Sequence, residues 1–272
     1  MLWRANRARR QLTALGLTVF LLGLGGVAGT AAGEKPTGDG NNVTLVSRWA
    51  KGECAATAVD GAWLFAGSGA LVQIFDASNP ADPLLRRTHQ MPSKVTCLEL
   101  WGDYLVVATS SDGVVVLDVT DPLSATQAGT MGSDYIKDVL CYGGRLYLAC
   151  GSYGLQNYEH HDVVIPPTHL ATYDPTLGYA NDVELYGSYL LVAANNDGLR
   201  VLDINSPEGP PVTTLDTTPY ATSIDISGTT AWIAAASNGV FSVDVSDPSA
   251  PVLLDTYDTA GSAAYVHATV DA

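Results

Sequence analysis

Tyrosine and aspartate side chains recur at matching places along this 272-residue sequence. Phenol and carboxyl groups gathered in one place can bind a cation, a sugar or a peptide. The alternative role is structural: each tyrosine packs between neighbouring sheets, and each aspartate accepts a backbone N–H. A histidine near the end of the chain is a further single candidate. The candidate binding residues are Tyr135, Asp138, Tyr179, Asp182, Tyr220 and His267.

Other residue types that could carry chemistry give weaker signals. His160, His161 and Asp162 are consecutive, but neighbours on a strand point to opposite faces, so both rings rarely reach one metal ion. The sequence contains no nucleophile elbow, phosphate-binding loop, zinc-protease motif or dinucleotide fingerprint. We therefore predict no catalytic residue, no metal site and no cofactor.

A second group of aspartates recurs in nearly every segment, at the point where a strand ends. An aspartate there can accept backbone N–H groups and fix the following turn. Their recurrence in nearly every unit favours a structural role, because an active site is a single group of residues that occurs once in the chain. The group comprises Asp76, Asp118, Asp203 and Asp244. Residues 195–198 read Asn-Asn-Asp-Gly, but they lack the further spaced acids of a calcium loop and indicate an ordinary turn.

The four cysteines occupy non-equivalent places, which indicates small buried thiols. A hairpin turn at Gly143-Gly144 would pair position 141 with 146, so Cys141 and Cys150 are out of register for a disulfide. A Cys54–Cys97 bond between neighbouring strands is conceivable.

These residues are positioned by a repeat. Two series of turn glycines share one frame, and an insertion of three residues falls in the same unit of both series. The first series, with steps of 41, 41, 44 and 41, is Gly61, Gly102, Gly143, Gly187 and Gly228. The second series, with steps of 41, 44 and 41, is Gly113, Gly154, Gly198 and Gly239.

Each unit contains four short strand signals. Within residues 179–218, segments 182–185 and 199–204 alternate, 189–193 is an unbroken apolar run, and 211–215 is richer in polar residues. Glycine-containing turns between such runs predict hairpins, and no helical periodicity is present outside the N-terminus. Four-stranded units of about 40 residues predict an all-β fold, a β-propeller. The first strand of each blade would then line the central channel.

The end of the third strand carries a recognisable pattern. It reads Val-Leu-Asp-Val-Thr-Asp-Pro at 116–122 and Val-Asp-Val-Ser-Asp-Pro at 243–248, with degenerate copies at 201–207 and 74–80. These segments resemble the LVIVD repeat of bacterial and archaeal secreted or surface β-propellers. The resemblance covers about residues 43–272 and implies fold and compartment more than activity. The third unit departs from it at 157–162, and the Trp-Asp dipeptide of WD40 blades is missing.

The predicted propeller spans 43–272 and holds five complete units and a partial sixth. Val43–Ser47 would supply an outer strand, and the final residues look like the first strand of a sixth blade, so we expect the chain to be truncated at its C-terminus. A five-bladed ring with a looser seam is the alternative. The expected units are about 51–92, 93–133, 134–177, 178–218, 219–260 and 261–272.

The N-terminus predicts export. Residues 1–11 carry four Arg and no acid, 12–29 are apolar, and small residues follow, as in a signal peptide over 1–32; an uncleaved anchor is the alternative. Residues 33–42 would be a flexible lead-in. Removing the four Arg leaves 9 basic against 28 acidic residues, a net charge of −19, which argues against a nucleic-acid partner.

From these features we expect an exported, monomeric binding module at the cell surface or outside the cell, with a protein, peptide or carbohydrate ligand and no membrane contact beyond the signal segment. A propeller enzyme, a metal-assisted hydrolase or lyase with its site at the channel mouth, is the first alternative. A structural or adhesion segment of a longer surface protein is the second.

Overall fold

The structure is a computed structural model that describes residues 54–132, 135–159, 168–173, 179–206, 210–216 and 220–268. The predicted signal peptide, the lead-in, Val43–Ser47 and the segment from His160 to Asp162 lie outside these residues. Within the described ranges, no helix is long and apolar enough to cross a membrane.

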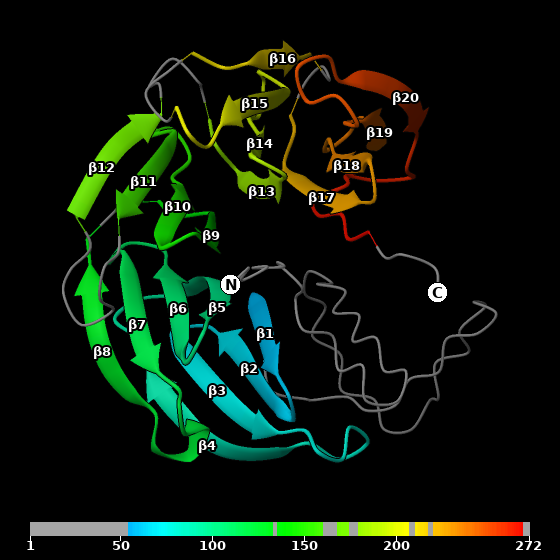
Figure 1. Cartoon of the computed structure of the whole chain (residues 1–272). Helices are drawn as coiled ribbons and strands as arrows, with labels where there is room; N and C mark the ends of the chain where they lie inside the picture. Colours follow the sequence, from blue (N-terminus) through cyan, green and yellow to red (C-terminus); the bar gives the residue numbers. More distant parts are fainter. Residues whose placement is uncertain are drawn as a thin grey trace.

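Five antiparallel sheets of four strands each form the described chain, which confirms the predicted all-β propeller. In every sheet the strands follow one another in chain order. Figure 1 shows the sheets arranged radially, with the first strand of each nearest the axis and the fourth at the rim. We refer to the sheets as blades 1 to 5.

The strands are short, as four-stranded blades require. Blade 1 holds β1 (Ala56–Asp60), β2 (Trp63–Ser68), β3 (Leu71–Asp76) and β4 (Leu84–Gln90). Blade 2 holds β5 (Val95–Trp101), β6 (Tyr104–Thr109), β7 (Val114–Asp118) and β8 (Thr126–Met131), with the short 3-10 helix η1 (Pro122–Ser124) before β8. Blade 3 holds β9 (Asp138–Tyr142), β10 (Arg145–Ala149), β11 (Leu155–Glu159) and β12 (Thr168–Tyr173).

The last two blades repeat the pattern. Blade 4 holds β13 (Asp182–Tyr186), β14 (Tyr189–Ala193), β15 (Leu199–Asp203) and β16 (Thr213–Leu215). Blade 5 holds β17 (Ser223–Ser227), β18 (Thr230–Ala234), β19 (Val240–Asp244) and β20 (Val252–Tyr257). The fourth strand expected at 211–215 is therefore shorter than its sequence signal.

The two glycine series occupy the same two turns of each unit. Every member has a positive φ, between 57° and 62° in the turn after the first strand and between 69° and 77° in the turn before the third. Tight turns of this kind need left-handed backbone, which glycine adopts at little cost. The repeat that these glycines predict is thus present in the backbone conformation.

A bulge also recurs at matching places. The pairing of the third and fourth strands shifts after Ile74, Val116, Asn157 and Ser242. A bulge bends the strand and increases its twist, so blades 1, 2, 3 and 5 share this curvature at the outer edge, whereas the described pairing of β15 with β16 in blade 4 has no shift.

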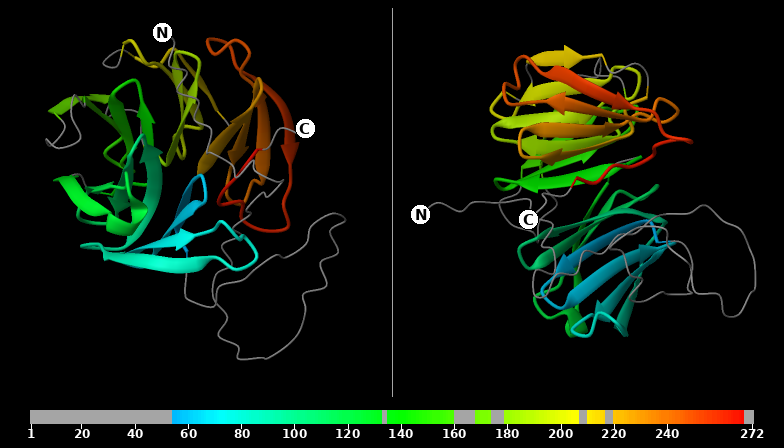
Figure 2. Two further views of the ribbon diagram at one scale, coloured as in Figure 1. Left: turned by 60° about the horizontal axis from the view of Figure 1, so that its bottom comes forward. Right: turned by 90° about the vertical axis from the view of Figure 1, so that its right-hand side faces the viewer.

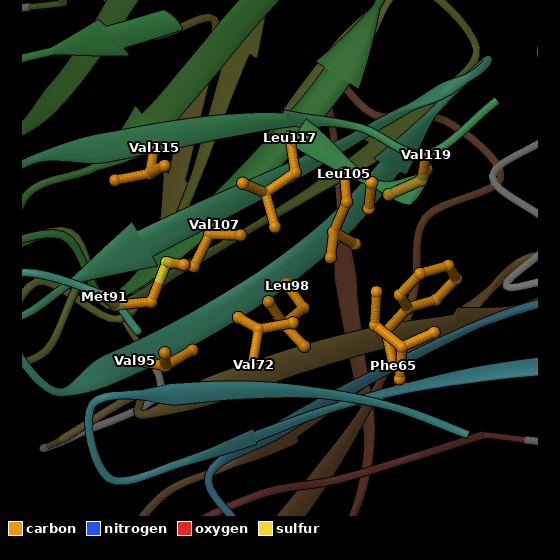
Figure 3. Close-up of a cluster of buried hydrophobic side chains, with 12 residues drawn as sticks. Phe65, Val72, Met91, Val95, Leu98, Leu105, Val107, Val115, Leu117 and Val119 are labelled. Atoms are coloured by element: carbon orange, nitrogen blue, oxygen red, sulfur yellow. The ribbon is translucent and has the colours of Figure 1, made fainter. Parts of the chain in front are cut away.

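The apolar cores lie between neighbouring blades rather than within them. Figure 3 shows the cluster between blades 1 and 2, where Phe65 and Val72 face Leu98, Leu105 and Leu117. Three similar clusters follow between the next pairs of blades. Burial of both faces explains the unbroken apolar runs in the second strands. The stability of the fold therefore depends on the contacts between successive repeats.

One equivalent position in the third strands carries a buried amide group. Asn157 on β11 is fully buried between blades 3 and 4, and neither side-chain nitrogen nor oxygen has a hydrogen-bond partner among the described residues. The equivalent positions, two residues before the end of the third strand, hold Ile74, Val116 and Val201 in blades 1, 2 and 4. In blade 5 the position holds the small polar Ser242, whose hydroxyl group donates to the carbonyl of Asp255 at 3.5 Å.

We expect Asn157→Val to raise the free energy of unfolding by about 1–2 kcal/mol, because a buried amide without partners pays its full desolvation penalty. Urea unfolding followed by tryptophan fluorescence measures the change. The matched control is Val116→Asn at the equivalent place in blade 2, which we expect to destabilise. A loss of stability in Asn157→Val would show instead that the amide is satisfied in solution.

Candidate functional site

The channel side of the inner strands carries a chain of polar contacts. Asp138 begins β9 and Asp182 begins β13, so both carboxyl groups stand at the entry end of the channel. Asp138 Oδ2 accepts the N–H of Val183 on the next inner strand at 3.2 Å. Asp182 Oδ2 accepts the N–H of Ile224 on the following one at 2.9 Å. Each carboxyl group therefore links its own blade to the next.

These two carboxyl groups also contact each other. Burial raises the pKa of Asp182 well above its ordinary value of 3.8, and the charge of Asp138 and the hydrogen bond between the two groups raise it further. Two carboxylates this close do not both ionise readily. The Asp182 carboxyl group therefore gives up its proton less readily than a solvated aspartate does.

A thiol completes this row. Cys97 on β5 donates its S–H to Asp138 Oδ1 at 3.3 Å. Burial and the charges of Asp138 and Glu99 raise the pKa of Cys97 well above its ordinary value of 9.0. A thiol held protonated is a poor nucleophile, so Cys97 serves here as a hydrogen-bond donor.

The same contacts continue beyond blade 5. Ala263 pairs with Ala236 just as Ala180 pairs with Gly151 and Ala221 with Asn195. Val266 N–H donates to Ser223 Oγ at 3.4 Å. Asp138 and Asp182 accept the N–H of the equivalent residue on the next inner strand in the same way. Figure 2 shows this last segment beside β17, on the side of blade 1. Residues 263–268 thus lie where the inner strand of a sixth unit belongs, as the repeat predicts.

This segment places two side chains of interest. Tyr265 is 86% exposed. Partial desolvation of its hydroxyl group raises the pKa of Tyr265, and the negative charge of Asp182 raises it further. His267 Nδ1 lies 2.6 Å from Asp225 Oδ2, which also accepts the N–H of Ala268 at 3.0 Å. The expected candidate His267 therefore pairs with Asp225 on β17. Asp225, two residues after Ser223 in an alternating strand, is the partner that sequence reasoning missed.

The three candidate tyrosines divide into two groups. Tyr135 and Tyr220 are 58% and 46% exposed, and both have positive φ, 60° and 84°. Tyr179 is half-buried, and its ring lies against the backbone of Gly151, where a Cβ would meet it at 3.2 Å. Tyr179 therefore packs against a neighbouring blade, whereas Tyr135 and Tyr220 are exposed to solvent.

A fourth tyrosine joins the exposed group. Tyr153, in the turn between β10 and β11, stacks on Tyr135 with ring centroids 6.0 Å apart and planes 22° from parallel. Its place, four residues after the end of β10, has no aromatic counterpart in the other units, which is why the repeat does not reveal it. Together Tyr135, Tyr153 and Tyr220 form what we term the tyrosine face, at the end of the propeller where each inner strand begins.

The recurrent aspartates have the predicted structural role. Each accepts the N–H of the residue two positions on: Asp76 from Ser78 at 3.1 Å, Asp118 from Thr120 at 3.0 Å, Asp203 from Asn205 at 2.8 Å and Asp244 from Ser246 at 2.9 Å. Hydrogen bonds from Ser78 and Arg86 lower the pKa of Asp76 to about 2. These carboxylates fix the turns at the opposite end of the propeller from the tyrosine face.

The remaining expectations concern turns, thiols and metals. Residues 195–198 close through a Gly198 N–H to Asn195 carbonyl bond of 3.2 Å, and Asp197 pairs with Arg200 at 3.4 Å. All four cysteines are free thiols, so Cys54 and Cys97 form no bond with each other. In the part of the chain that the structure describes, no three His, Cys, Asp or Glu side chains converge as a metal site requires.

Comparisons with known proteins agree with this geometry. A family model described as LVIVD repeat matches residues 94–131, 177–212 and 219–259. Among the curated proteins, no sequence matches this chain.

Solved structures show the same fold at low identity. The computationally designed protein Ika8 is 14% identical, with a TM-score of 0.64 over 80% of this chain and 66% of its own. The β-propeller domain of Myceliophteria thermophila Cps50 (Swd1) is 15% identical, with a TM-score of 0.59 over 77% and 73%. Chaetomium thermophilum Sqt1, bound to the N-terminus of the ribosomal protein L10, is 14% identical, with a TM-score of 0.57 over 74% and 61%. This chain spans about two thirds of the length of these structures.

Proposed function

Because the chain is a β-propeller built from LVIVD repeats, we propose that it binds another protein through the tyrosine face and works at the cell surface or outside the cell. A propeller is a rigid scaffold whose loops at one end vary without disturbing the blades. The function therefore depends on that end of the channel.

The observation that carries the proposal is the conformation of Tyr135 and Tyr220. A tyrosine with positive φ stores backbone strain of about 1–2 kcal/mol, and both residues nevertheless keep about half of their surface exposed to solvent. Strained, exposed aromatic residues are typical of binding surfaces, because tyrosine gives a large contact area with few rotatable bonds.

A protein ligand fits this surface better than a sugar does. The exposed tyrosines are spread over the entries of two blades and one neighbouring turn instead of lining one pocket. Flat aromatic patches with a polar surround are characteristic of protein interfaces. The related fold of Sqt1, solved with a peptide segment of its partner, gives a precedent for this use of a propeller.

The proposed location depends on the N-terminal sequence alone. Its basic start, apolar run and small-residue exit are the features of an exported chain. Expression in a bacterial host followed by N-terminal sequencing of the secreted protein tests this, and a chain retained in the cytoplasm with Met1 intact would contradict it.

We expect Tyr220→Gly to weaken ligand binding at least tenfold while leaving the free energy of unfolding unchanged or raised by up to about 1 kcal/mol, because glycine relieves the strain at positive φ. The binding probe is a peptide selected from a random twelve-residue library against the full chain, and urea unfolding gives the stability. The matched control is Leu123→Gly in η1, a 53% exposed side chain at the opposite end of the propeller, which should not change binding. Equal affinity in both variants would reject the tyrosine face.

The runner-up function is an enzyme at the channel mouth, which the contact between the carboxyl groups of Asp138 and Asp182 favours, since a carboxyl pair can act as acid and base. Both carboxyl groups, however, also accept backbone N–H groups of the next blade. Hydrolase assays on the full chain, with and without added divalent metal, decide between the functions. Turnover that Asp182→Asn abolishes would reverse the ranking.

A further inference from the structure

The outer strand of blade 5 differs from the other outer strands. All six residues of β20 are exposed, and most are apolar: Val252, Leu253, Leu254 and Tyr257. Figure 1 shows β20 at the rim of the propeller, and its described pairing is with β19 alone. Outer strands present free backbone N–H and C=O groups to any extended chain that approaches.

Two of the other outer strands, β4 and β16, are better protected. In blade 1, Leu84 and Leu85 are followed by Arg86 and Arg87, and Arg87 donates to the carbonyl of Leu123 in η1, which lies against β4. In blade 4, β16 is only three residues long. Charge, covering and shortness are the usual ways of blocking a strand edge. On β20 the only charged residue is Asp255.

The surroundings of β20 carry one sign of charge. No Lys or Arg occurs after Arg200, whereas nine acidic residues follow it. Blade 5 contributes Asp244, Asp247, Asp255 and Asp258 around this edge. Asp255 Oδ1 accepts the N–H of Thr256 at 2.8 Å, which holds the carboxylate beside the backbone of the strand. An approaching peptide therefore meets aliphatic side chains within a negative field.

From these contacts we infer that β20 is a second interaction surface, which adds an extended, positively charged peptide of a partner as a fifth strand. Strand addition supplies backbone hydrogen bonds, and alternate side chains give specificity. Lys or Arg side chains of the partner meet the carboxylates of blade 5, and its aliphatic side chains pack on Val252, Leu253 and Leu254. This surface is at the rim and does not depend on the tyrosine face.

The test uses a labelled peptide of alternating Lys and Val, with two comparison peptides: one of alternating Glu and Val, and one in which proline replaces every second Val. The variant is Leu253→Lys, and the matched control is Leu85→Lys. These two leucines occupy the same register in blades 5 and 1, opposite Val243 and Phe75, and are 44% and 43% exposed. Thermal unfolding of both variants shows whether each is folded.

We expect the Lys-Val peptide alone to bind, more weakly as salt rises, and Leu253→Lys to weaken it at least tenfold while Leu85→Lys leaves it unchanged. Equal binding of the proline peptide, or equal loss in both variants, would mean unspecific attraction to an acidic protein and overturns the proposal. Analytical sedimentation of the full chain shows whether a second copy of this chain binds at β20 in place of a peptide. A dimer that Leu253→Lys dissociates would assign this edge to self-association and likewise overturn it.

Discussion

Replacing Gly239 with alanine should be the most damaging small substitution in blade 5, with a loss of about 3 kcal/mol or more in the free energy of unfolding. Gly239 has a φ of +77°, and a Cβ there would overlap the backbone carbonyl of Tyr257. Alanine therefore adds left-handed strain of about 1 kcal/mol to a backbone clash that only a shift of β20 relieves.

The matched control is Gly228→Ala in the same blade. Gly228 has a φ of +62° but no atom within 4 Å of the added Cβ, so only the strain applies, about 1 kcal/mol. Urea unfolding of both variants gives the difference. Equal losses would mean that the close approach of Gly239 to the end of β20 does not exist in solution.

The second large effect is a change in pH dependence on replacing Asp182 with asparagine. The pKa of Asp182 is raised by burial and by Asp138. Below the ordinary value of 3.8 both folded and unfolded chains hold the proton, but between 3.8 and the raised pKa only the folded chain does. Rising pH therefore favours unfolding until it passes the raised pKa, above which the loss is complete.

We expect Asp182→Asn to be more stable than the unsubstituted chain at pH 8 by roughly 1–2 kcal/mol, because the amide removes a poorly solvated charge and keeps a hydrogen bond to Asp138. The advantage should shrink as the pH falls toward 4. The midpoints of urea unfolding of both chains, measured from pH 4 to pH 8, give this difference in stability.

Asp118→Asn is the comparison of opposite sign. Hydrogen bonds from Thr120 lower the pKa of Asp118, so this carboxylate stabilises the fold above the ordinary pKa and the contribution is lost as pH falls through the lowered one. Asp118→Asn should therefore be less stable at neutral pH and equal to the unsubstituted chain in acid. If Asp182→Asn behaved in this same way, the pKa of Asp182 would not be raised in the folded chain.

The repeat could be predicted because its signals are local. Turn glycines, alternating segments and the aspartates at strand ends each depend on a few neighbouring residues, and all of them recur in frame. Tandem copies with the same turns leave few ways to bury the apolar runs. The sequence thus contains the blade, the strand order and the role of Asp76, Asp118, Asp203 and Asp244.

The site was predictable only in part, because it forms between units. Alignment places Asp138 and Asp182 at one level of the channel, but it does not reveal the raised pKa of Asp182, which depends on burial and on the nearby charge of Asp138. Tyr153 and Asp225 were missed because their partners, Tyr135 and His267, lie in other segments. Tyr179 packs against Gly151, whereas the equivalent residues Tyr135 and Tyr220 are exposed. The repeat does not reveal this difference, because it depends on the turn of the neighbouring blade.

The binding role of the tyrosine face is tested most directly by placing a photoreactive benzoylphenylalanine at Tyr220 in the full chain, in its native cell, and at Asp103 at the opposite end of the propeller as the control. Illumination should give one discrete covalent adduct with a second protein from position 220, and Tyr135→Gly in the same chain should abolish it. No adduct from position 220, or the same adducts from position 103, would contradict a binding surface at this end of the channel.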